Sequence, residues 1–336
     1  MLASSVLGGL PEQTVAVTGG TASEVSVWSH YVAYGTGQPR MGPSHVEVRD
    51  LTAGGRLLLL VSSEFAGGDV DWARGDGTTL TYLDTYTPPD PQHLVPGPGV
   101  DRWAIGVIDI DTGARRVLAR GGPLGGGIVE LPLPLISHGE VLWHQVDPGR
   151  HRNAINEVAV AGGPVRTLLS AGGLESVSVA GDRIVYDLAT SSHGDATLWQ
   201  LPLHGGVPQP IASSGRAAWP DASTDGVVWQ ETSPHAQTGP DRIGYAPYAG
   251  GAWRYLARGV SQGNVAAGSD FVAWWTSSDG VKVHRLSDGA TFTLHPTTGN
   301  LDVGSRMSAT GTRLVWGSAD VNLTTGIIHI VTVPGA

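Results

Sequence analysis

One short pattern recurs seven times along the chain and limits the folds available to it. The pattern is a small or turn-forming pair, one free position, two mostly apolar residues and then Trp or Tyr. It ends at Tyr34, Tyr82, Trp143, Tyr186, Trp229, Trp274 and Trp316. The gaps between successive aromatics are 48, 61, 43, 43, 45 and 42 residues. Such a period indicates a repeat architecture in which each unit is one supersecondary element.

Each repeat resolves into four short strands. One strand precedes the turn pair, as at 176–180, and an apolar strand follows it, as at 183–188. A variable loop comes next, and then a hairpin with a glycine-containing turn, as at 158–169. Glycine supplies the positive φ that tight hairpins need. The sequence therefore predicts an all-β fold, a seven-bladed β-propeller with four-stranded antiparallel blades.

The two ends of the chain predict how the ring closes. The seventh copy has only three strands and finishes at 326–333, whereas 13–18 is a strand with no partner in its own repeat. We expect this N-terminal strand to pair into the last blade, because an unpaired edge favours aggregation. Residues 1–12 are then a tail, and 13–336 form a single domain. The expected blades are 21–61, 66–120, 127–170, 173–213, 216–258, 260–295, and 298–333 plus 13–18.

The best copies of the repeat carry a turn with Asp or Gly before an apolar-apolar-aromatic strand. They read GDRIVY at 181–186, TDGVVW at 224–229 and SDFVAW at 269–274. This arrangement resembles the TolB-like and WD40-like propeller repeats of bacterial envelope and secreted proteins, over essentially the whole chain from residue 13 onward. The resemblance implies the propeller fold and a secreted, periplasmic or cell-envelope location. It implies no single activity, because this fold hosts hydrolases, lyases, lectins and docking platforms.

Composition excludes some classes of partner. The net charge is −10 and no cluster of cations is present, so we expect no nucleic-acid ligand. The chain has no cysteine, which removes disulfides and thiolate chemistry. No apolar run approaches the roughly 20 residues that span a bilayer. The first residues lack the basic segment of an intact secretory signal. We expect a monomer.

The aromatic that ends each repeat most simply packs between neighbouring blades, since such side chains bury a large apolar area. A binding site is better sought on the face where the loops between second and third strands meet the connections between blades. Six of the twelve histidines fall in those loops. We expect a saccharide, peptide or protein ligand there. The candidate ligand-binding residues are His93, Trp103, His151, His193, Trp219, Asp221 and His235.

An enzyme on the same face is the alternative, most plausibly a polysaccharide lyase acting on a uronate-containing glycan, or else another carbohydrate-active enzyme. Such a lyase needs a neutral base for the C5 proton and a cation or metal to neutralise the carboxylate. His144 is the candidate base, with Arg150 as the neutralising cation and Tyr86 on the opposite side. The loop 84–102, rich in proline, is a candidate wall or lid.

No cofactor is required by any motif, but oxygen ligands near the axis could hold Ca²⁺. The connections between blades contribute Glu24, Glu64, Asp69, Glu130, Glu175, Trp219, Asp221, Asn264, Asn300 and Asp302. Hydration and capping of a water-filled channel is the competing interpretation of these polar residues.

Overall fold

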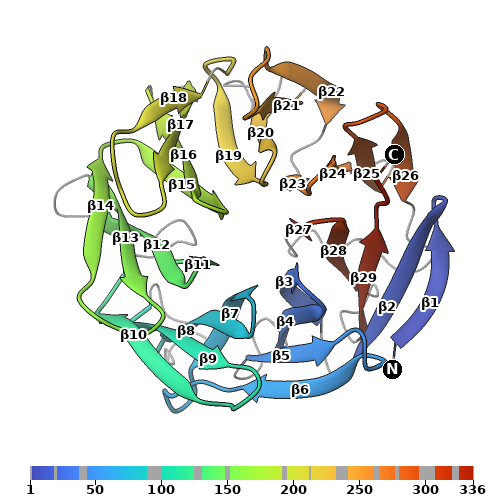
Figure 1. The fold of residues 1–336 in the computed structure, drawn as a ribbon. Coiled ribbons are helices and arrows are strands. Elements are labelled where there is room, and N and C mark those ends of the chain that lie inside the picture. The colour runs from blue at the N-terminus through green and yellow to red at the C-terminus, as the bar shows by residue number, and fades with distance from the viewer. Residues whose placement is uncertain are drawn as a thin grey trace.

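Seven antiparallel sheets stand around a common axis in the computed structural model, which confirms the predicted seven-bladed β-propeller (Figure 1). The structure describes residues 2–18, 21–37, 44–88, 100–124, 131–147, 152–190, 195–211, 213–231, 241–260, 265–276, 280–294, 307–319 and 325–335. No helix occurs among these residues, and accordingly none of them forms a helix long and apolar enough to cross a membrane.

Blades 1 to 6 each contain four consecutive strands, the first lying nearest the axis and the fourth at the rim. Blade 1 contains β3 (Thr21–Trp28), β4 (Tyr31–Gly37), β5 (His45–Asp50) and β6 (Arg56–Val61). Blade 2 contains β7 (Asp69–Asp76), β8 (Thr79–Tyr86), β9 (Arg102–Asp109) and β10 (Arg115–Gly121). Blade 3 contains β11 (Pro134–Ser137), β12 (Glu140–Asp147), β13 (Arg152–Ala159) and β14 (Arg166–Ala171). Blade 4 contains β15 (Leu174–Ala180), β16 (Arg183–Ala189), β17 (Ala196–Pro202) and β18 (Gln209–Ile211).

The remaining blades complete the ring. Blade 5 contains β19 (Ala217–Ala222), β20 (Gly226–Glu231), β21 (Asp241–Pro247) and β22 (Arg254–Val260). Blade 6 contains β23 (Val265–Ala267), β24 (Phe271–Thr276), β25 (Gly280–Arg285) and β26 (Thr291–Leu294). Blade 7 contains β27 (Ser308–Thr310), β28 (Arg313–Ala319) and β29 (Thr325–Thr332), followed by β2 (Leu10–Thr18) and β1 (Leu2–Leu7) from the N-terminus.

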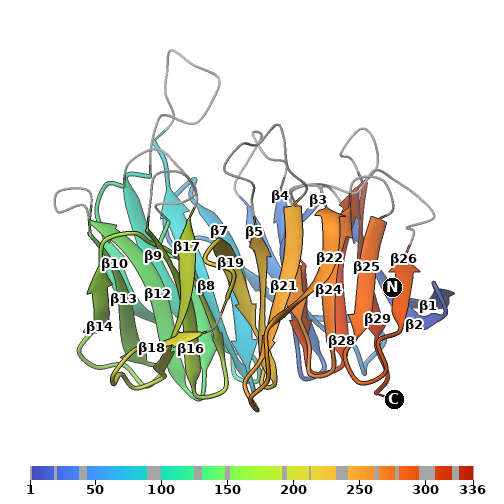
Figure 2. The same ribbon diagram turned by 90° about the horizontal axis from the view of Figure 1, so that it is seen from above.

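The strands run between two faces of a disc (Figure 2). First strands begin, and second strands end, at the same face, which we call the loop face. The opposite face carries the tight turns that join first to second and third to fourth strands, and we call it the turn face. The turn from β11 to β12 at His138–Gly139 is one example. A residue near the start of a first strand is therefore close to both the axis and the loop face.

The seven repeat aromatics fill the interfaces between blades, as their spacing predicted. Each is at most 5% exposed, and Trp229 and Tyr34 are fully buried. Trp229 pairs across the sheet with Gly244, and a Cβ atom at Gly244 would stand 2.2 Å from the indole ring. The missing side chain thus gives the indole a surface to lie on. Burial of such large aromatic surfaces stabilises the packing of blade on blade.

The N-terminal strand closes the ring as predicted. β2 lies between β1 and β29, with Glu12 opposite Val331 and Thr18 opposite Thr325. A buried hydrogen-bond chain crosses this junction: Ser318 Oγ lies 2.8 Å from His329 Nε2, and His329 Nδ1 lies 2.7 Å from Glu12 Oε1. The three side chains are at most 8% exposed, so they join three strands of blade 7 and are not open to a substrate.

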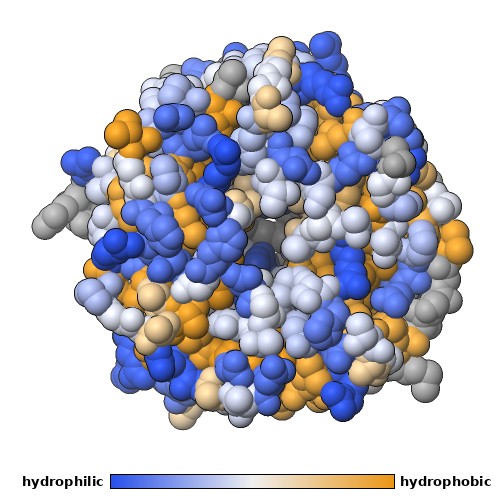
Figure 3. Space-filling model, viewed as in Figure 1, coloured by the Kyte–Doolittle hydropathy of each residue, from blue (hydrophilic) through white to orange (hydrophobic). Residues whose placement is uncertain are grey.

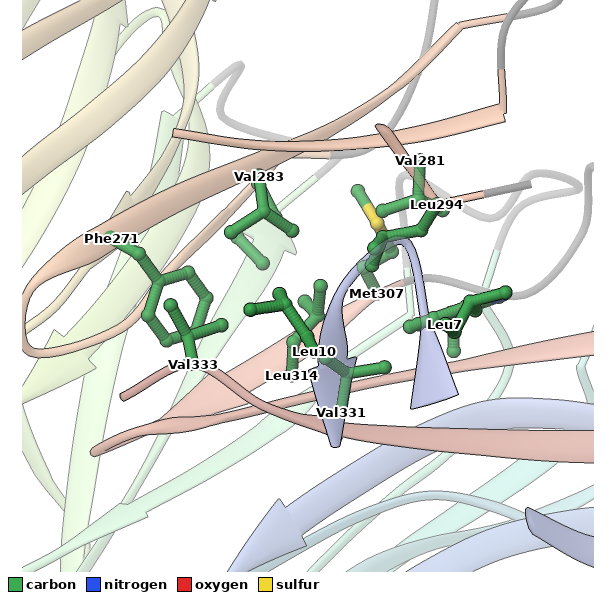
Figure 4. Close-up of a cluster of buried hydrophobic side chains, with 13 residues drawn as sticks. Leu7, Leu10, Phe271, Val281, Val283, Leu294, Met307, Leu314, Val331 and Val333 are labelled. Atoms are coloured by element: carbon green, nitrogen blue, oxygen red, sulfur yellow. The ribbon is translucent and has the colours of Figure 1, made fainter. Parts of the chain in front are cut away.

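The prediction that residues 1–12 form a tail is wrong, because residues 2–7 and 10–12 belong to two paired strands. β1 pairs with β2 through a Gly8–Gly9 turn in which both residues have positive φ, 57° and 89°. Leu7 and Leu10, only 7% and 2% exposed, pack between blades 6 and 7 against residues such as Leu294 (Figure 4). The prediction failed because these leucines contact residues nearly 300 positions away, which no local pattern in the N-terminal residues reports.

Candidate functional site

Several of the innermost strands bulge where they approach the loop face. The pairing of first with second strand slips between Ser23 and Ser26 in blade 1, and likewise between Asp71 and Arg74 in blade 2. It also slips in blades 4 and 5, at 174–177 and 218–221. A bulge adds residues to one strand and re-aims its side chains. These bulges therefore decide which groups face the axis and which face solvent.

Three of the bulges hold a non-glycine residue in the left-handed region. Glu24, Trp72 and Trp219 have φ of 47°, 55° and 50°. Such a conformation is unfavourable for a bulky side chain and persists only where the surroundings enforce it. Glu24 and Trp72 are buried, but Trp219 is 48% exposed. Trp219 is thus the one member of this set that presents an aromatic ring to solvent.

A buried carboxylate holds the bulges of blades 4 and 5 together. Asp187, at the middle of β16, is 0% exposed. Its oxygens accept hydrogen bonds from the Ser176 backbone nitrogen at 2.7 Å and the Ser176 hydroxyl at 3.0 Å. They also accept one from the Trp219 backbone nitrogen at 3.0 Å. We call Asp187, Ser176 and Trp219 the carboxylate clamp, since one side chain fixes both bulges.

The clamp places an acid beside the exposed indole. Glu175 lies in the blade 4 bulge and its side chain is exposed. Burial raises the pKa of Asp187 to about 6, opposed by its hydrogen bonds, and the charge of Glu175 raises it further. Glu175 is therefore close to the clamp that positions Trp219. Trp219 and Glu175 are thus both exposed, on the innermost strands of the neighbouring blades 5 and 4.

Two carboxylates on the innermost strands around the channel, Asp71 and Asp221, have Arg74 close to both. Burial raises the pKa of Asp71 to about 6, and it raises the pKa of Asp221 as well. Arg74 lies within electrostatic range of both, because its charge lowers each pKa. Asp221 accepts hydrogen bonds from Ser178 Oγ at 3.1 Å and from the Ala267 nitrogen at 2.9 Å, so it links blades 4, 5 and 6. Figure 3 shows the ring hollowed at its centre.

The structure describes two of the three residues predicted for a lyase, His144 and Tyr86. His144 is half-buried in β12, and burial lowers its pKa despite a hydrogen bond to the Leu174 backbone. Its Nε2 is buried and has no hydrogen-bond partner among the described residues. Tyr86 is at the end of β8, and the guanidinium carbon of Arg102 lies over its ring, 5.7 Å from the ring centroid. Arg150 lies outside the described residues.

The predicted ligand-binding residues separate into three groups. Trp219 and Asp221 lie in the bulge of β19, at the clamp and the channel wall. Trp103 is a correction: it is 4% exposed and lies over Gly121 in the core between blades 2 and 3, out of reach of a ligand on the surface. The other four predicted residues lie outside the described residues. They are His93, His151, His193 and His235.

The oxygen ligands expected around the axis do not gather in the described part of the chain. Asp69 accepts a hydrogen bond from the Ser44 nitrogen at 2.7 Å, and both oxygens of Asp221 already have donors. Glu130, Asn264, Asn300 and Asp302 lie outside the described residues. Among the residues that are described, the one group of three acids or histidines close enough to share a metal ion is Glu140, Glu157 and His204, on the turn face.

Asp187 is the site residue that sequence reasoning missed. It directly follows the repeat aromatic Tyr186, where other blades carry residues such as Gly35, Leu83 or Trp275. An aspartate in that position, at the middle of an otherwise apolar strand, is a signal that a buried polar group needs partners. The identity of those partners depends on how blades 4 and 5 stack.

Comparison with solved structures supports the fold at identities too low to show more. An oligogalacturonate lyase in complex with manganese has a TM-score of 0.59 and 11% identity, over 99% of this chain and 96% of that one. The β-propeller domain of the Trilobed protease from Pyrococcus furiosus gives 0.63 and 10%, over 92% and 94%. An acylaminoacyl peptidase in complex with Z-Gly-Gly-Phe-chloromethyl ketone gives 0.64 and 12%, over 90% of this chain and 49% of the peptidase. No family and no curated protein matches the sequence.

Proposed function

We propose that this chain is a saccharide-binding propeller whose ligand stacks on Trp219 at the loop face. The observation that carries the proposal is the exposed indole held at φ 50° by a fully buried carboxylate. A bulky residue with a strained backbone costs stability, so it persists only where function or packing requires it. The contact that holds Trp219 is made by its backbone nitrogen with Asp187, whereas about half of the residue is exposed to solvent. An indole face is a good surface for the C–H face of a sugar ring, and Glu175 can accept hydrogen bonds from its hydroxyls.

Charge favours a neutral saccharide over a polyuronate. The chain carries a net charge of −10, and the innermost strands around the channel include Asp71 in blade 2 and Asp221 in blade 5. A surface of one sign repels a polyanion of the same sign and slows its association. An extracytoplasmic location is part of the proposal and rests on the resemblance of the repeats to TolB-like propellers.

A polysaccharide lyase remains the second candidate, favoured by one observation. Burial lowers the pKa of the partly buried His144, which favours the neutral imidazole that a general base requires. Oligogalacturonate lyases adopt a similar propeller, which is compatible with this candidate. The two functions differ in their product: a lyase releases an unsaturated uronate, and a binding protein releases nothing.

The test is affinity electrophoresis of the purified chain in gels containing soluble neutral glucans, xylan, mannan or polygalacturonate. We expect retardation by a neutral glycan and a dissociation constant about tenfold or more weaker for Trp219→Ala, as for aromatic anchors generally. Glu175→Gln should weaken binding less. Val207→Ala is the control, because Val207 is 79% exposed on the turn face.

Two outcomes would contradict the proposal. Equal retardation of wild-type and Trp219→Ala protein would remove the indole from the site. A rise in ultraviolet absorbance on incubation with polygalacturonate, lost in His144→Ala, would establish the lyase instead. Melting temperatures of all variants should be measured first, so that a loss of binding is not mistaken for a loss of folded protein.

A further inference from the structure

We propose that Glu140, Glu157 and His204 form a divalent transition-metal site on the turn face, joining blade 3 to blade 4. The site is distinct from the saccharide site, which lies on the opposite face. One ligand atom from each of the three residues lies within 4.8 Å of the others. Two carboxylates and one imidazole are a ligand set that zinc and similar ions accept in proteins.

Glu157 is the centre of the arrangement. It lies in β13 and is 0% exposed, so its charge is removed from water. Arg166 donates a hydrogen bond to its Oε2, but Oε1 is buried with no hydrogen-bond partner among the described residues. A buried, ionised carboxylate oxygen without a partner is costly. The free oxygen points to His204, whose Nδ1 lies 3.5 Å away.

The spacing suits coordination better than it suits a direct bond. At 3.5 Å the imidazole nitrogen and Oε1 make no hydrogen bond, and they form an ion pair only when His204 is protonated. Two ligands of a tetrahedral zinc ion with bonds of about 2.0–2.2 Å lie about 3.3–3.6 Å apart. Glu140, the third ligand, begins β12 opposite Ala159, and Glu157 lies two residues before Ala159 in β13, so the two acids are on the same face of the sheet.

The fourth position of such an ion would be open to water. His204 is 65% exposed, and it stands in the turn between β17 and β18 of blade 4, next to β13 and β14 in the ring (Figure 1). The turn is placed against blade 3, since a Cβ atom on Gly205 would contact Leu168 of β14 at 3.5 Å. His204 and Glu140 can therefore adjust toward an ion while Glu157 stays fixed. The Arg166 guanidinium on Oε2 orients the Glu157 carboxylate.

The test uses the full chain after removal of metal with a chelator. Isothermal titration with zinc chloride should give one site per chain, and Co²⁺ should give the visible absorption of a four-coordinate ion. The melting temperature should rise with metal concentration and then saturate, because the ion binds only the folded chain. His204→Gln and Glu140→Gln, both at accessible positions, should weaken binding at least about tenfold.

A matched control lies on the same face. His138 is 57% exposed and pairs with a single carboxylate, Asp182, at 2.9 Å. His138→Gln should therefore leave metal affinity unchanged. Absence of a single zinc site in wild-type protein would overturn the proposal, and so would a site that survives His204→Gln or is lost in His138→Gln. Saccharide binding by His204→Gln protein should be normal, which separates this test from that of the loop-face site.

Discussion

At the scale of single residues, the carboxylate clamp makes stability depend on pH. Asp187 has a folded pKa of about 6 and an ordinary value of 3.8. Because the folded value is the higher one, the contribution to stability is fully present below the unfolded pKa and is lost as pH rises through the folded pKa. Between pH 5 and pH 7 the loss amounts to about 1 kcal/mol.

We therefore predict that Asp187→Asn flattens the pH profile of stability. The free energy of unfolding, measured by urea titration at pH 5 and at pH 7, should differ between the two conditions by about 1 kcal/mol less in the variant than in wild-type protein. Asp71, with a folded pKa of about 6, contributes in the same direction and remains in the variant, so some dependence should persist. An unchanged profile would mean that Asp187 stays ionised throughout this range.

The residues show what sequence could and could not predict about the site. Trp219 and Asp221 were predicted from their place in a connection between blades, which the topology of a propeller alone puts near the axis. Trp103 was predicted because it flanks the loop 84–102, and it is buried, because one step along a strand turns a side chain from solvent to core. Glu157 and His204 come from blades 3 and 4, and neither residue is distinctive in its own repeat.

At the scale of strands, the repeat aromatics depend on what lies opposite them. Trp229 rests on Gly244, where a Cβ atom would stand 2.2 Å from the ring. Gly244→Ala should therefore force the fully buried indole out of position and lower the free energy of unfolding by about 1–3 kcal/mol. Chemical denaturation checks this. Gly122→Ala is the control, since nothing lies within 4 Å of a Cβ atom there, and it should change stability little.

The strands themselves were predicted well, whereas their irregularities were not. Alternation and turn chemistry identify second strands such as 183–188, because these depend on neighbours in sequence. The bulge that turns Trp219 outward arises from a hydrogen bond to Asp187 in another blade. The sequence of this segment is that of an ordinary strand, so the backbone strain at Trp219 could not be predicted without knowing how the two blades pack.

At the scale of the whole molecule, the ring is held shut by an N-terminal hairpin instead of a single strand. β2 supplies the fourth strand of blade 7, and β1 adds a fifth at the rim. The turn at Gly8 lies against blade 6, because a Cβ atom there would stand 2.5 Å from the Thr293 carbonyl oxygen. The hairpin thus contacts the blade before the junction as well as the blade that it completes.

Truncation should therefore act in two steps. Deletion of residues 1–8 removes β1 and the burial of Leu7, which is 7% exposed, but leaves a four-stranded blade like the other six. We expect a folded protein that is less stable by about 1.5–3 kcal/mol, seen as a lower urea midpoint with an unchanged slope.

Deletion of residues 1–18 also removes β2, the buried Glu12 and the core residue Leu10, and leaves the edge of β29 unpaired. That variant should aggregate or unfold, because an exposed strand edge and a broken junction act together. A silent deletion of residues 1–8 would show that the hairpin does not stabilise the ring, and equal damage from both deletions would show that β1, not β2, is the strand that closes it.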